Sequence, residues 1–211
     1  MESLEKFLGK SKPHNLNNQH PPTDPNERYM WESKLLFSVY NRLNNNCTLL
    51  DYGCGGYGTL KTSLFDRFPD AKYYGLDIRK FINPEGDKVN LGHIDDLVNV
   101  IPNVDCMVAG SVFSHLSWEG IENVLNKLKP LFDKGGEFGF TTILSDKYEL
   151  LYPNWYGSDT YGMSIITEKQ YYDYCTKNGL IFEILPFSYP MIDNPYKKQN
   201  YCNIRKDTQS L

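Results

Sequence analysis

A glycine-rich turn between two acidic residues carries the clearest chemical signal in the sequence. The segment 48–60 reads TLLDYGCGGYGTL, so a short apolar run ends in Asp51 and glycines follow directly. Glycines permit positive φ angles and let a ligand approach the main chain, where backbone amides at a helix start can donate to it. About 24 residues further on, a second apolar run ends in Asp77, whose carboxylate could accept hydrogen bonds from ribose hydroxyls. Together these features predict an adenosine-type ligand.

Two ligands of this type have to be compared. The letters GCGGYG at residues 53–58 fit the dinucleotide pattern G-x-G-x-x-G, so a nicotinamide-dependent dehydrogenase is one alternative. The negative charge of Asp51 would repel a pyrophosphate but favour the sulfonium and ammonium groups of S-adenosylmethionine (SAM). The only Tyr-x-x-x-Lys in the chain is Tyr57 with Lys61, inside the glycine loop itself, and no substrate domain remains. We therefore expect SAM as the cofactor.

Strand and helix patterns alternate along the chain, and they must bring these residues together. Strands are predicted over Cys47–Asp51, Lys72–Ile78, Lys88–Gly92, Cys106–Val112 and Glu137–Ile143. Helices are predicted over Leu60–Arg67 and Trp118–Phe132, with Ser117 as N-cap and an end near Lys129 because of Pro130, and a weaker turn lies near Asp95–Val100. Such alternation predicts a doubly wound α/β sheet, with the ligand at the carboxyl ends of its parallel strands.

The amino-terminal part is predicted to be an arm over residues 1–28, a candidate lid over the cofactor. Residues 11–28 are polar and proline-rich, and His14 and His20 are interpreted as ordinary tail residues. The main domain would cover residues 29–211. It opens with a helix whose apolar stripe is Trp31, Leu35, Val39 and Leu43, and the three asparagines 44–46 should end it.

The carboxyl-terminal part has a different pattern. Residues 148–164 are interpreted as an aromatic, loop-like acceptor cap. A capping box at Thr167 and Gln170 opens a short helix that Asn178-Gly179 closes. The last two runs, Ile181–Tyr189 and Asn200–Arg205, are predicted to form an antiparallel hairpin at the edge of the sheet.

Four motifs together resemble the class I SAM-dependent methyltransferases, particularly their broad small-molecule group, from about residue 29 to residue 205. They are LDYGCG at residues 50–55, YGLDI at 74–78, DCMVAGSVFSHL at 105–116 and LKPLFDKGG at 128–136. The resemblance implies a Rossmann-like seven-stranded sheet with strand order 3-2-1-4-5-7-6 and the last strand antiparallel. It also implies that Asp51, Gly53 and Gly55 line the methionine portion of SAM, that Asp77 holds the ribose and that Ile78 lies against adenine.

The sequence departs from the family pattern at two places. Tyr57 stands where the family has a third glycine, which indicates a one-residue insertion, and Tyr57 is kept among the cofactor-binding candidates. After the third strand the family often places an aspartate against the adenine amine. Here the run His93-Ile94-Asp95 follows, so either His93 or Asp95 could serve, with Ile94 between them. Ser111 could touch the methionine portion or simply form a strand-end turn.

Methyl transfer is an in-line displacement, and alignment alone can contribute about 7–11 kcal/mol. A neutral hydroxyl acceptor also benefits from a base. His115 is the candidate base by position, a scaffold role being the alternative, and Asp159 is the second candidate. The cap residues Trp155, Tyr156 and Tyr161 are predicted to bind the acceptor, unless they only pack at the surface.

Composition limits the class of protein. The 211 residues suit one domain, and 22 basic against 26 acidic side chains give a net charge of −4. Basic residues form no run longer than a weak pair such as Lys197-Lys198, so nucleic acid is not expected as a partner, and no apolar stretch approaches a membrane span. Five cysteines without close paired spacing favour reduced thiols, no metal site and a cytoplasmic location.

The leading hypothesis is an O-methyltransferase for a hydroxyl of a saccharide or other small metabolite, in polysaccharide or secondary-metabolite tailoring. Methylation of an anionic oxygen such as phosphate, or of a nitrogen, needs less help from a base and remains an alternative. A second alternative, from a different class, is a non-catalytic SAM-binding partner subunit.

Overall fold

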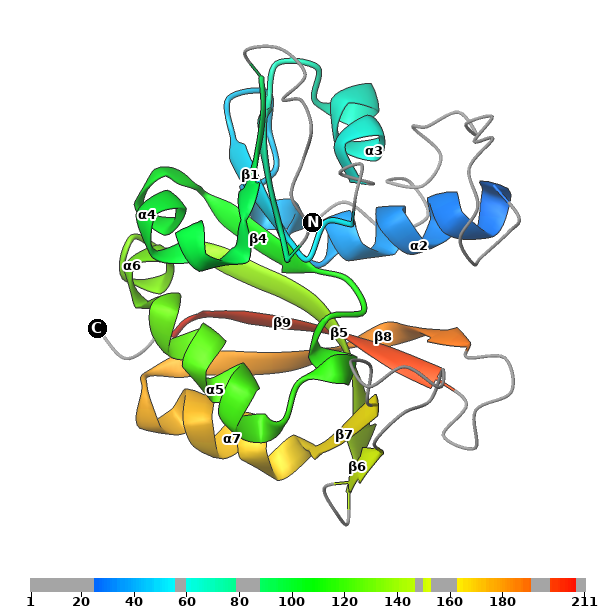
Figure 1. The fold of residues 1–211 in the computed structure, drawn as a ribbon, viewed down its shortest axis with the longest axis vertical. Coiled ribbons are helices and arrows are strands. Elements are labelled where there is room, and N and C mark those ends of the chain that lie inside the picture. The colour runs from blue at the N-terminus through cyan, green and yellow to red at the C-terminus, as the bar shows by residue number, and fades with distance from the viewer. Residues whose placement is uncertain are drawn as a thin grey trace.

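Strands and helices alternate to build a nine-stranded sheet in this computed structural model (Figure 1). The structure describes residues 25–55, 60–78, 88–146, 150–152, 163–190 and 198–207. The strands are β1 (Thr48–Tyr52), β2 (Lys72–Asp77), β3 (Val89–His93), β4 (Cys106–Ala109), β5 (Glu137–Ser145), β6 (Leu150–Tyr152), β7 (Met163–Thr167), β8 (Leu180–Pro190) and β9 (Lys198–Lys206). The helices are α2 (Pro25–Phe37), α3 (Leu60–Arg67), α4 (Leu97–Val100), α5 (Trp118–Lys127), α6 (Lys129–Asp133) and α7 (Glu168–Lys177). The 3-10 turns are η1 (Tyr40–Arg42), η2 (Ile94–Asp96), η3 (Ile101–Asn103) and η4 (Phe113–His115).

The strand order confirms the predicted α/β topology. β3, β2, β1, β4 and β5 lie side by side and parallel, β9 pairs antiparallel with β5, and β8 pairs antiparallel with β9. If β6 and β7 are set aside, β8 and β9 count as the sixth and seventh strands. The order is then the predicted 3-2-1-4-5-7-6, with β9 as the antiparallel last strand. The predicted hairpin near the chain end is β8 and β9. A β-bulge between Ile184 and Ser188 interrupts its register.

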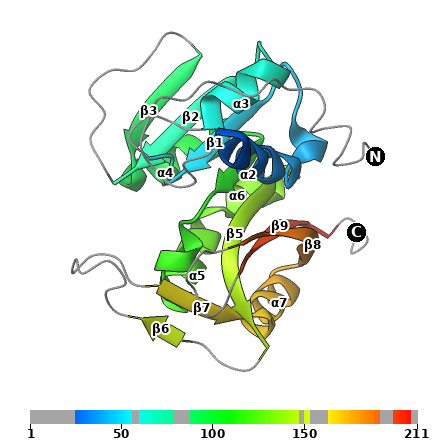
Figure 2. The same cartoon turned by 90° about the vertical axis from the view of Figure 1, so that its right-hand side faces the viewer.

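β6 and β7 correct the prediction that residues 148–164 are only a loop. β5 is long enough to have two different neighbours (Figure 2). Its residues 137–142 pair with β9, and its last residues, Ile143–Ser145, pair in parallel with β7 instead. β6 then pairs antiparallel with β7. The sequence pattern did not predict these strands, because β6 spans three residues and is too short to show an alternating pattern.

The first helix was predicted with wrong limits at both ends. α2 begins at Pro25, inside the segment expected to be extended, because the fixed φ of proline suits the first helical turn. It ends at Phe37, well before the three asparagines, and the Ser38 hydroxyl donates back to the Leu35 carbonyl there. Val39 and Leu43 therefore lie beyond the helix, although both are buried as the stripe predicted.

Helices cover both faces of the sheet. In Figure 1, α2 lies above β8 and β9, while α5 and α7 lie below them. Since side chains alternate along a strand, Leu49 packs into the cluster beneath α2 and α3, and Leu50 packs into the cluster beneath α5 and α7. Ser117 caps α5 as predicted, and α5 gives way to α6 at Leu128, next to Pro130. No helix of the described chain is long and apolar enough to cross a membrane.

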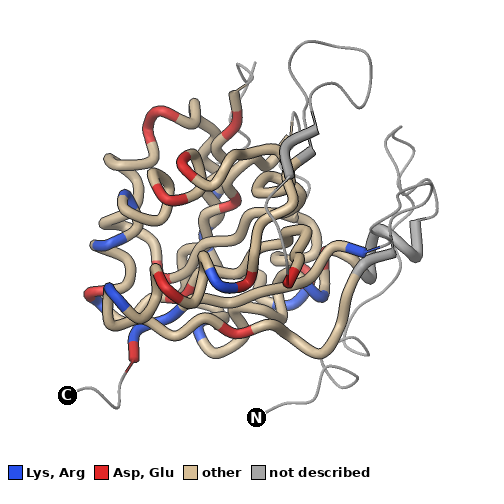
Figure 3. The backbone as a smooth tube through the Cα atoms, turned by 90° about the horizontal axis from the view of Figure 1, so that it is seen from below, with Lys and Arg blue, Asp and Glu red and all other residues tan. Residues whose placement is uncertain are grey.

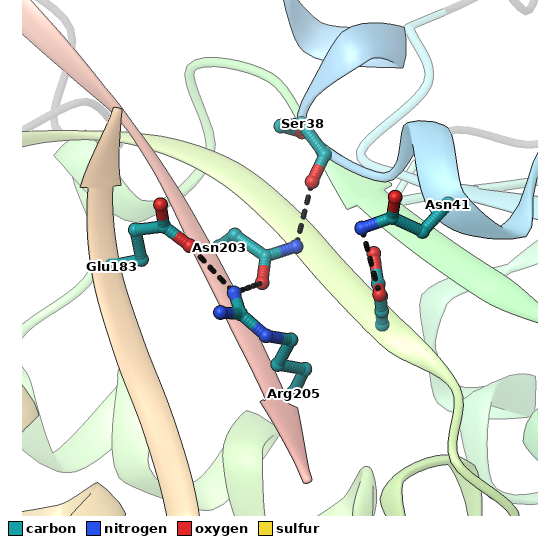
Figure 4. A network of polar contacts seen from close by, with 6 residues as sticks. Ser38, Asn41, Glu183, Asn203 and Arg205 are labelled. Carbon is teal, nitrogen blue, oxygen red and sulfur yellow. Dashed lines mark hydrogen bonds and ion pairs between the residues drawn. The ribbon is translucent and has the colours of Figure 1, made fainter. Parts of the chain in front are cut away.

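A polar network holds the end of α2 to the amino-terminal halves of β5 and β8 and to the carboxyl-terminal half of β9 (Figure 4). The side-chain amide of Asn203 donates to the Ser38 carbonyl at 2.6 Å, and both residues are buried. Arg205 donates to the Asn203 side chain at 3.3 Å and to Glu183 at 2.6 Å. These groups line a cavity of about 490 Å³. Because Glu137, the first residue of β5, also lines it, this cavity lies away from the carboxyl edge of the sheet.

We expect Asn203→Ala to lower the free energy of unfolding by about 1–3 kcal/mol, because it leaves the buried Ser38 carbonyl without its donor. Urea unfolding measures the change. Glu183→Gln is the control from the same network, and removing that half-exposed ion pair should change the free energy by less than about 1 kcal/mol. Equal effects of the two substitutions would contradict a buried, structural role for Asn203.

Candidate cofactor site

The carboxyl ends of the parallel strands bring the predicted cofactor residues to one edge of the sheet. Asp51, near the end of β1, lies opposite Gly75 of β2 and Val108 of β4. Asp77, the last residue of β2, lies opposite His93, the last residue of β3. Residues predicted from separate segments of the chain are therefore neighbours in space.

The glycine loop folds back onto the end of β2. The amides of Gly53 and Cys54 donate to the Leu76 carbonyl at 2.7 and 3.1 Å. Gly53 has φ +74°, and a Cβ atom on it would lie 2.2 Å from Cγ2 of Val112. Only glycine fits here, since both the backbone conformation and the contact exclude a side chain. The loop therefore presents bare main chain at the edge of the sheet.

Asp77 connects the second strand to this loop. Its side chain is buried, and its Oδ2 atom accepts a hydrogen bond from the Gly55 amide at 2.8 Å. The next residue, Ile78, has 61% of its surface exposed, which is unusual for a large apolar side chain. A carboxylate with a neighbouring exposed apolar surface suits the ribose and the base of a nucleoside.

Asp51 is a buried carboxylate with two hydrogen-bond donors. The Tyr73 hydroxyl donates to its Oδ2 atom at 2.7 Å, and the backbone amide of Leu60, at the start of α3, also donates to it. The pKa of Asp51 is raised to about 7: burial raises it most, the negative charges of Glu32 and Asp77 add to this, and the two hydrogen bonds oppose the change. The site therefore favours a cation that would compensate this carboxylate.

His93 and Asp95 were alternatives for one role, and the structure joins them in a single cap. The His93 Nδ1 atom lies 3.3 Å from the Asp95 amide nitrogen and 3.1 Å from the Asp95 Oδ2 atom. The His93 amide in turn donates to Asp96 at 3.2 Å, which closes a capping box on η2. Ile94 is half-buried between them. The cap begins directly beside Asp77, so both candidates lie at the same strand ends as Asp77.

Ser111 lies in the turn after β4, which ends at Ala109 rather than at the predicted Val112. Its φ of +57° is the only positive value among the described residues other than glycine. The Ser111 amide donates to the Thr141 hydroxyl at 2.7 Å, and its own hydroxyl donates to Gln199 at 3.1 Å. Strained backbone of this kind is concentrated at functional sites, where neighbouring groups hold it in place.

His115 is the last residue of η4, on the same connection after β4, and its side chain is exposed. Five other candidates lie outside the described residues: Tyr57, Trp155, Tyr156, Asp159 and Tyr161. All five cysteines are free and buried, and burial raises the pKa of the Cys54 thiol beside the glycine loop. Within the described ranges, no three His, Cys, Asp or Glu side chains gather as a metal site would require.

Comparison with known proteins identifies the fold. The sequence matches no protein-family model and no curated protein. Among solved structures, the Burkholderia thailandensis 1,6-didemethyltoxoflavin-N1-methyltransferase, with its substrate and S-adenosylhomocysteine bound, is similar with a TM-score of 0.63 and 15% identity. That match covers 87% of this chain and 80% of the other. The chain has the class I methyltransferase fold.

Two further methyltransferases with bound SAM share this fold. Magnesium protoporphyrin IX methyltransferase from Synechocystis has a TM-score of 0.58 and 14% identity, over 90% of this chain and 86% of that one. Human N-acetylserotonin methyltransferase has a TM-score of 0.54 and 17% identity, over 87% of this chain but 56% of that one. These methyltransferases are named for widely different substrates, so the methyltransferase fold by itself does not identify an acceptor.

Sequence reasoning missed several residues of this methyltransferase-fold site. Tyr73 holds Asp51, and Glu32 of α2 is buried close enough to affect the pKa of Asp51. Gln199 of β9 is buried and bonds Ser111. No local pattern could have found them, because each comes from an element distant in sequence from the residue that it contacts.

We expect Gly53→Ala to lower the free energy of unfolding by about 2–5 kcal/mol, because the positive φ and the collision with Val112 both add cost. Gly179→Ala is the matched control: φ there is +63°, but nothing lies within 4 Å of the added Cβ. It should cost only about 1–2 kcal/mol. Urea unfolding of both variants measures the difference, and a smaller loss for Gly53→Ala than for Gly179→Ala would contradict the described contact.

Proposed function

We propose that the protein is a SAM-dependent methyltransferase for a small-molecule acceptor, and that the methylated group is a hydroxyl of a saccharide or other metabolite. The observation that carries this proposal is the hydrogen bond from the Gly55 amide to the buried Asp77 at the carboxyl edge of a class I methyltransferase fold. This bond holds a buried carboxylate, which would bind the nucleoside, beside the glycine loop. SAM would supply an electrophilic methyl group bonded to a positively charged sulfur.

The described residues divide between the two ends of that cofactor. Asp77 would accept hydrogen bonds from the ribose hydroxyls with the oxygen that Gly55 does not use. Ile78 and the His93–Asp95 cap would lie against the adenine. Gly53 and Gly55 would face the methionine portion, and Asp51 would complement its positive charge.

Asp51 also argues against a dinucleotide cofactor. A pyrophosphate at the glycine loop would lie near Asp51 and Asp77, both buried and with Glu32 close by. Like charges at such separations in a poorly solvated site repel each other strongly. SAM carries two positive groups and one negative group, so the same carboxylates attract it. Electrostatics therefore favours methyl transfer over hydride transfer at this site.

For a hydroxyl acceptor, His115 is our proposed base. Its exposed side chain lies on the connection that leaves the carboxyl end of β4, which is the edge where the cofactor would bind. An imidazole there can take the acceptor proton as the oxygen bonds to carbon. Ser111 with the buried Thr141 and Gln199 would shape the adjacent wall. The aromatic segment 148–164 would close over the acceptor.

Calorimetric titration tests the cofactor. We expect S-adenosylhomocysteine to bind and NAD not to bind. Asp77→Asn should weaken that binding about 10- to 100-fold, because a charged acceptor for the ribose is replaced by a neutral amide. Asp70→Asn, which changes an exposed partner of Lys88, should leave the affinity unchanged. Preference for NAD, or an undiminished affinity in Asp77→Asn, would contradict the proposal.

Activity of His115→Gln tests the base, with a panel of hydroxylated acceptors and SAM. We expect kcat to fall about 10²- to 10⁴-fold, the usual contribution of a general base, with unchanged affinity for S-adenosylhomocysteine. Unchanged kcat would remove the base assignment and direct attention to Asp159 or to an acceptor that needs no base. Binding of the nucleoside without turnover of any acceptor would favour a SAM-binding partner subunit.

A further inference from the structure

Three acidic side chains from different elements converge beneath the glycine loop. Glu32 comes from α2, Asp51 from β1 and Asp77 from β2, and their exposed fractions are 2%, 2% and 7%. The Ser63 hydroxyl on α3 donates to Glu32, and Glu32 and Asp77 both raise the pKa of Asp51 by their negative charge. Burial of so many carboxylates is costly unless donors or cations compensate them.

Within the described part of the chain, two groups donate hydrogen bonds to Asp51. From β2, the Tyr73 hydroxyl donates to Asp51 at 2.7 Å and is itself fully buried. From α3, the Leu60 amide donates to it. The neighbouring strand β4 presents the apolar Val108 opposite Asp51. In the glycine loop, the Cys54 thiol is close enough to interact with both Asp51 and Tyr73.

α3 carries two basic residues, Lys61 and Arg67, and the described bonds of Arg67 go to other groups than Asp51. Arg67 donates to the Ser63 carbonyl at 2.9 Å and to the Ser33 hydroxyl at 2.6 Å, which ties α2 to α3. Acidic and basic positions both occur along the described chain (Figure 3), and charges far from the site are screened by salt. The charge state of Asp51 therefore depends on its immediate neighbours.

We propose that Tyr73 and Glu32 are opposing positioning residues, Tyr73 keeping Asp51 ionised and Glu32 favouring its protonation, so that binding of the cationic end of the cofactor releases a proton from Asp51. The inference rests on the proposed function and deepens it. Tyr73 acts by donating a hydrogen bond that only the ionised carboxylate fully uses. Glu32 acts through its negative charge.

The direction of the pH dependence follows from the pKa of Asp51, which is raised to about 7, most of all by burial. In the empty protein, Asp51 would be about one-tenth ionised at pH 6 and about nine-tenths ionised at pH 8. A cationic ligand binds the ionised form better and lowers that pKa. Affinity should therefore rise about tenfold between pH 6 and pH 8, and the proton release should be largest below pH 7.

Two conservative substitutions move this profile in opposite directions. Tyr73→Phe removes the donor but keeps the ring, so Asp51 becomes harder to ionise and the profile moves to higher pH. Glu32→Gln removes the negative charge but keeps an acceptor for the Ser63 hydroxyl, so the profile moves to lower pH. A merely structural role for Glu32 predicts weaker binding, whereas this mechanism predicts tighter binding at pH 6.5.

The experiment is calorimetric titration of the full chain with S-adenosylhomocysteine between pH 6 and pH 8.5, in buffers of different ionisation enthalpy. The wild type, Tyr73→Phe, Glu32→Gln and Asp51→Asn are compared, so that titration of the ligand itself is common to all four. We expect a several-fold gain in affinity for Glu32→Gln at pH 6.5 and a several-fold loss for Tyr73→Phe at pH 7. For Asp51→Asn we expect no proton release from this site.

The outcomes separate the two proposals. No binding to the wild type at any pH would overturn the proposed function and this inference with it. Binding with the same pH profile in wild type, Glu32→Gln and Asp51→Asn would overturn the inference alone. If Tyr73→Phe does not fold, Glu32→Gln still decides, because unchanged or weaker binding at pH 6.5 contradicts the mechanism.

Discussion

The hydrogen bond between Asp77 and the Gly55 amide is the contact on which the site depends. It ties the end of β2 to the loop that follows β1, across 22 residues of sequence. The amides of Gly53 and Cys54 reinforce it by bonding the carbonyl of Leu76. Residues 53–55 of the loop are thereby held against the strand ends. Without this closure, the acidic residues and the glycines would be separate features of two strands.

Burial of acidic side chains at the same edge costs stability, and attraction of a positively charged ligand would explain that cost. Carboxylates are rarely buried without a cation, because desolvation disfavours the charged form. Here Asp51 and Glu32 are both buried, with hydroxyl and amide donors as their described partners. Such an arrangement is the expected cost of a site that must attract a positively charged ligand, since stability and function compete for the same residues.

Two polar networks lie at different places on the sheet and have different roles. The network of Asn203, Ser38 and Arg205 lies towards the amino ends of β5 and β8 and attaches α2 to the sheet. The network of Ser111 and Gln199 lies past the end of β4, near the proposed cofactor site. β5 connects the two regions, because its first part pairs with β9 and its last residues pair with β7. The same strand thus supports the scaffold at one end and holds β7 at the other.

The strand order was implied by the family resemblance. The sequence by itself determined the fold class, the caps of α5 and α7, and the edge where Asp51 and Asp77 meet. These follow from local signals. The signals are apolar runs, glycines at a turn that requires a positive φ, and capping side chains a few residues from the amides that they bind. The limits of α2 and the existence of β6 and β7 were not determined in this way, because they depend on which neighbour each segment finds.

Only the tertiary structure decided what surrounds the acidic residues. Tyr73 lies 22 residues from Asp51 and Ser63 lies 31 residues from Glu32, so nothing in the local pattern couples them. The same holds for Ser111 and Gln199, which are 88 residues apart. A carboxylate can be located by its place after a strand, but its ionisation depends on burial and on neighbours that the packing of the sheet and helices brings together.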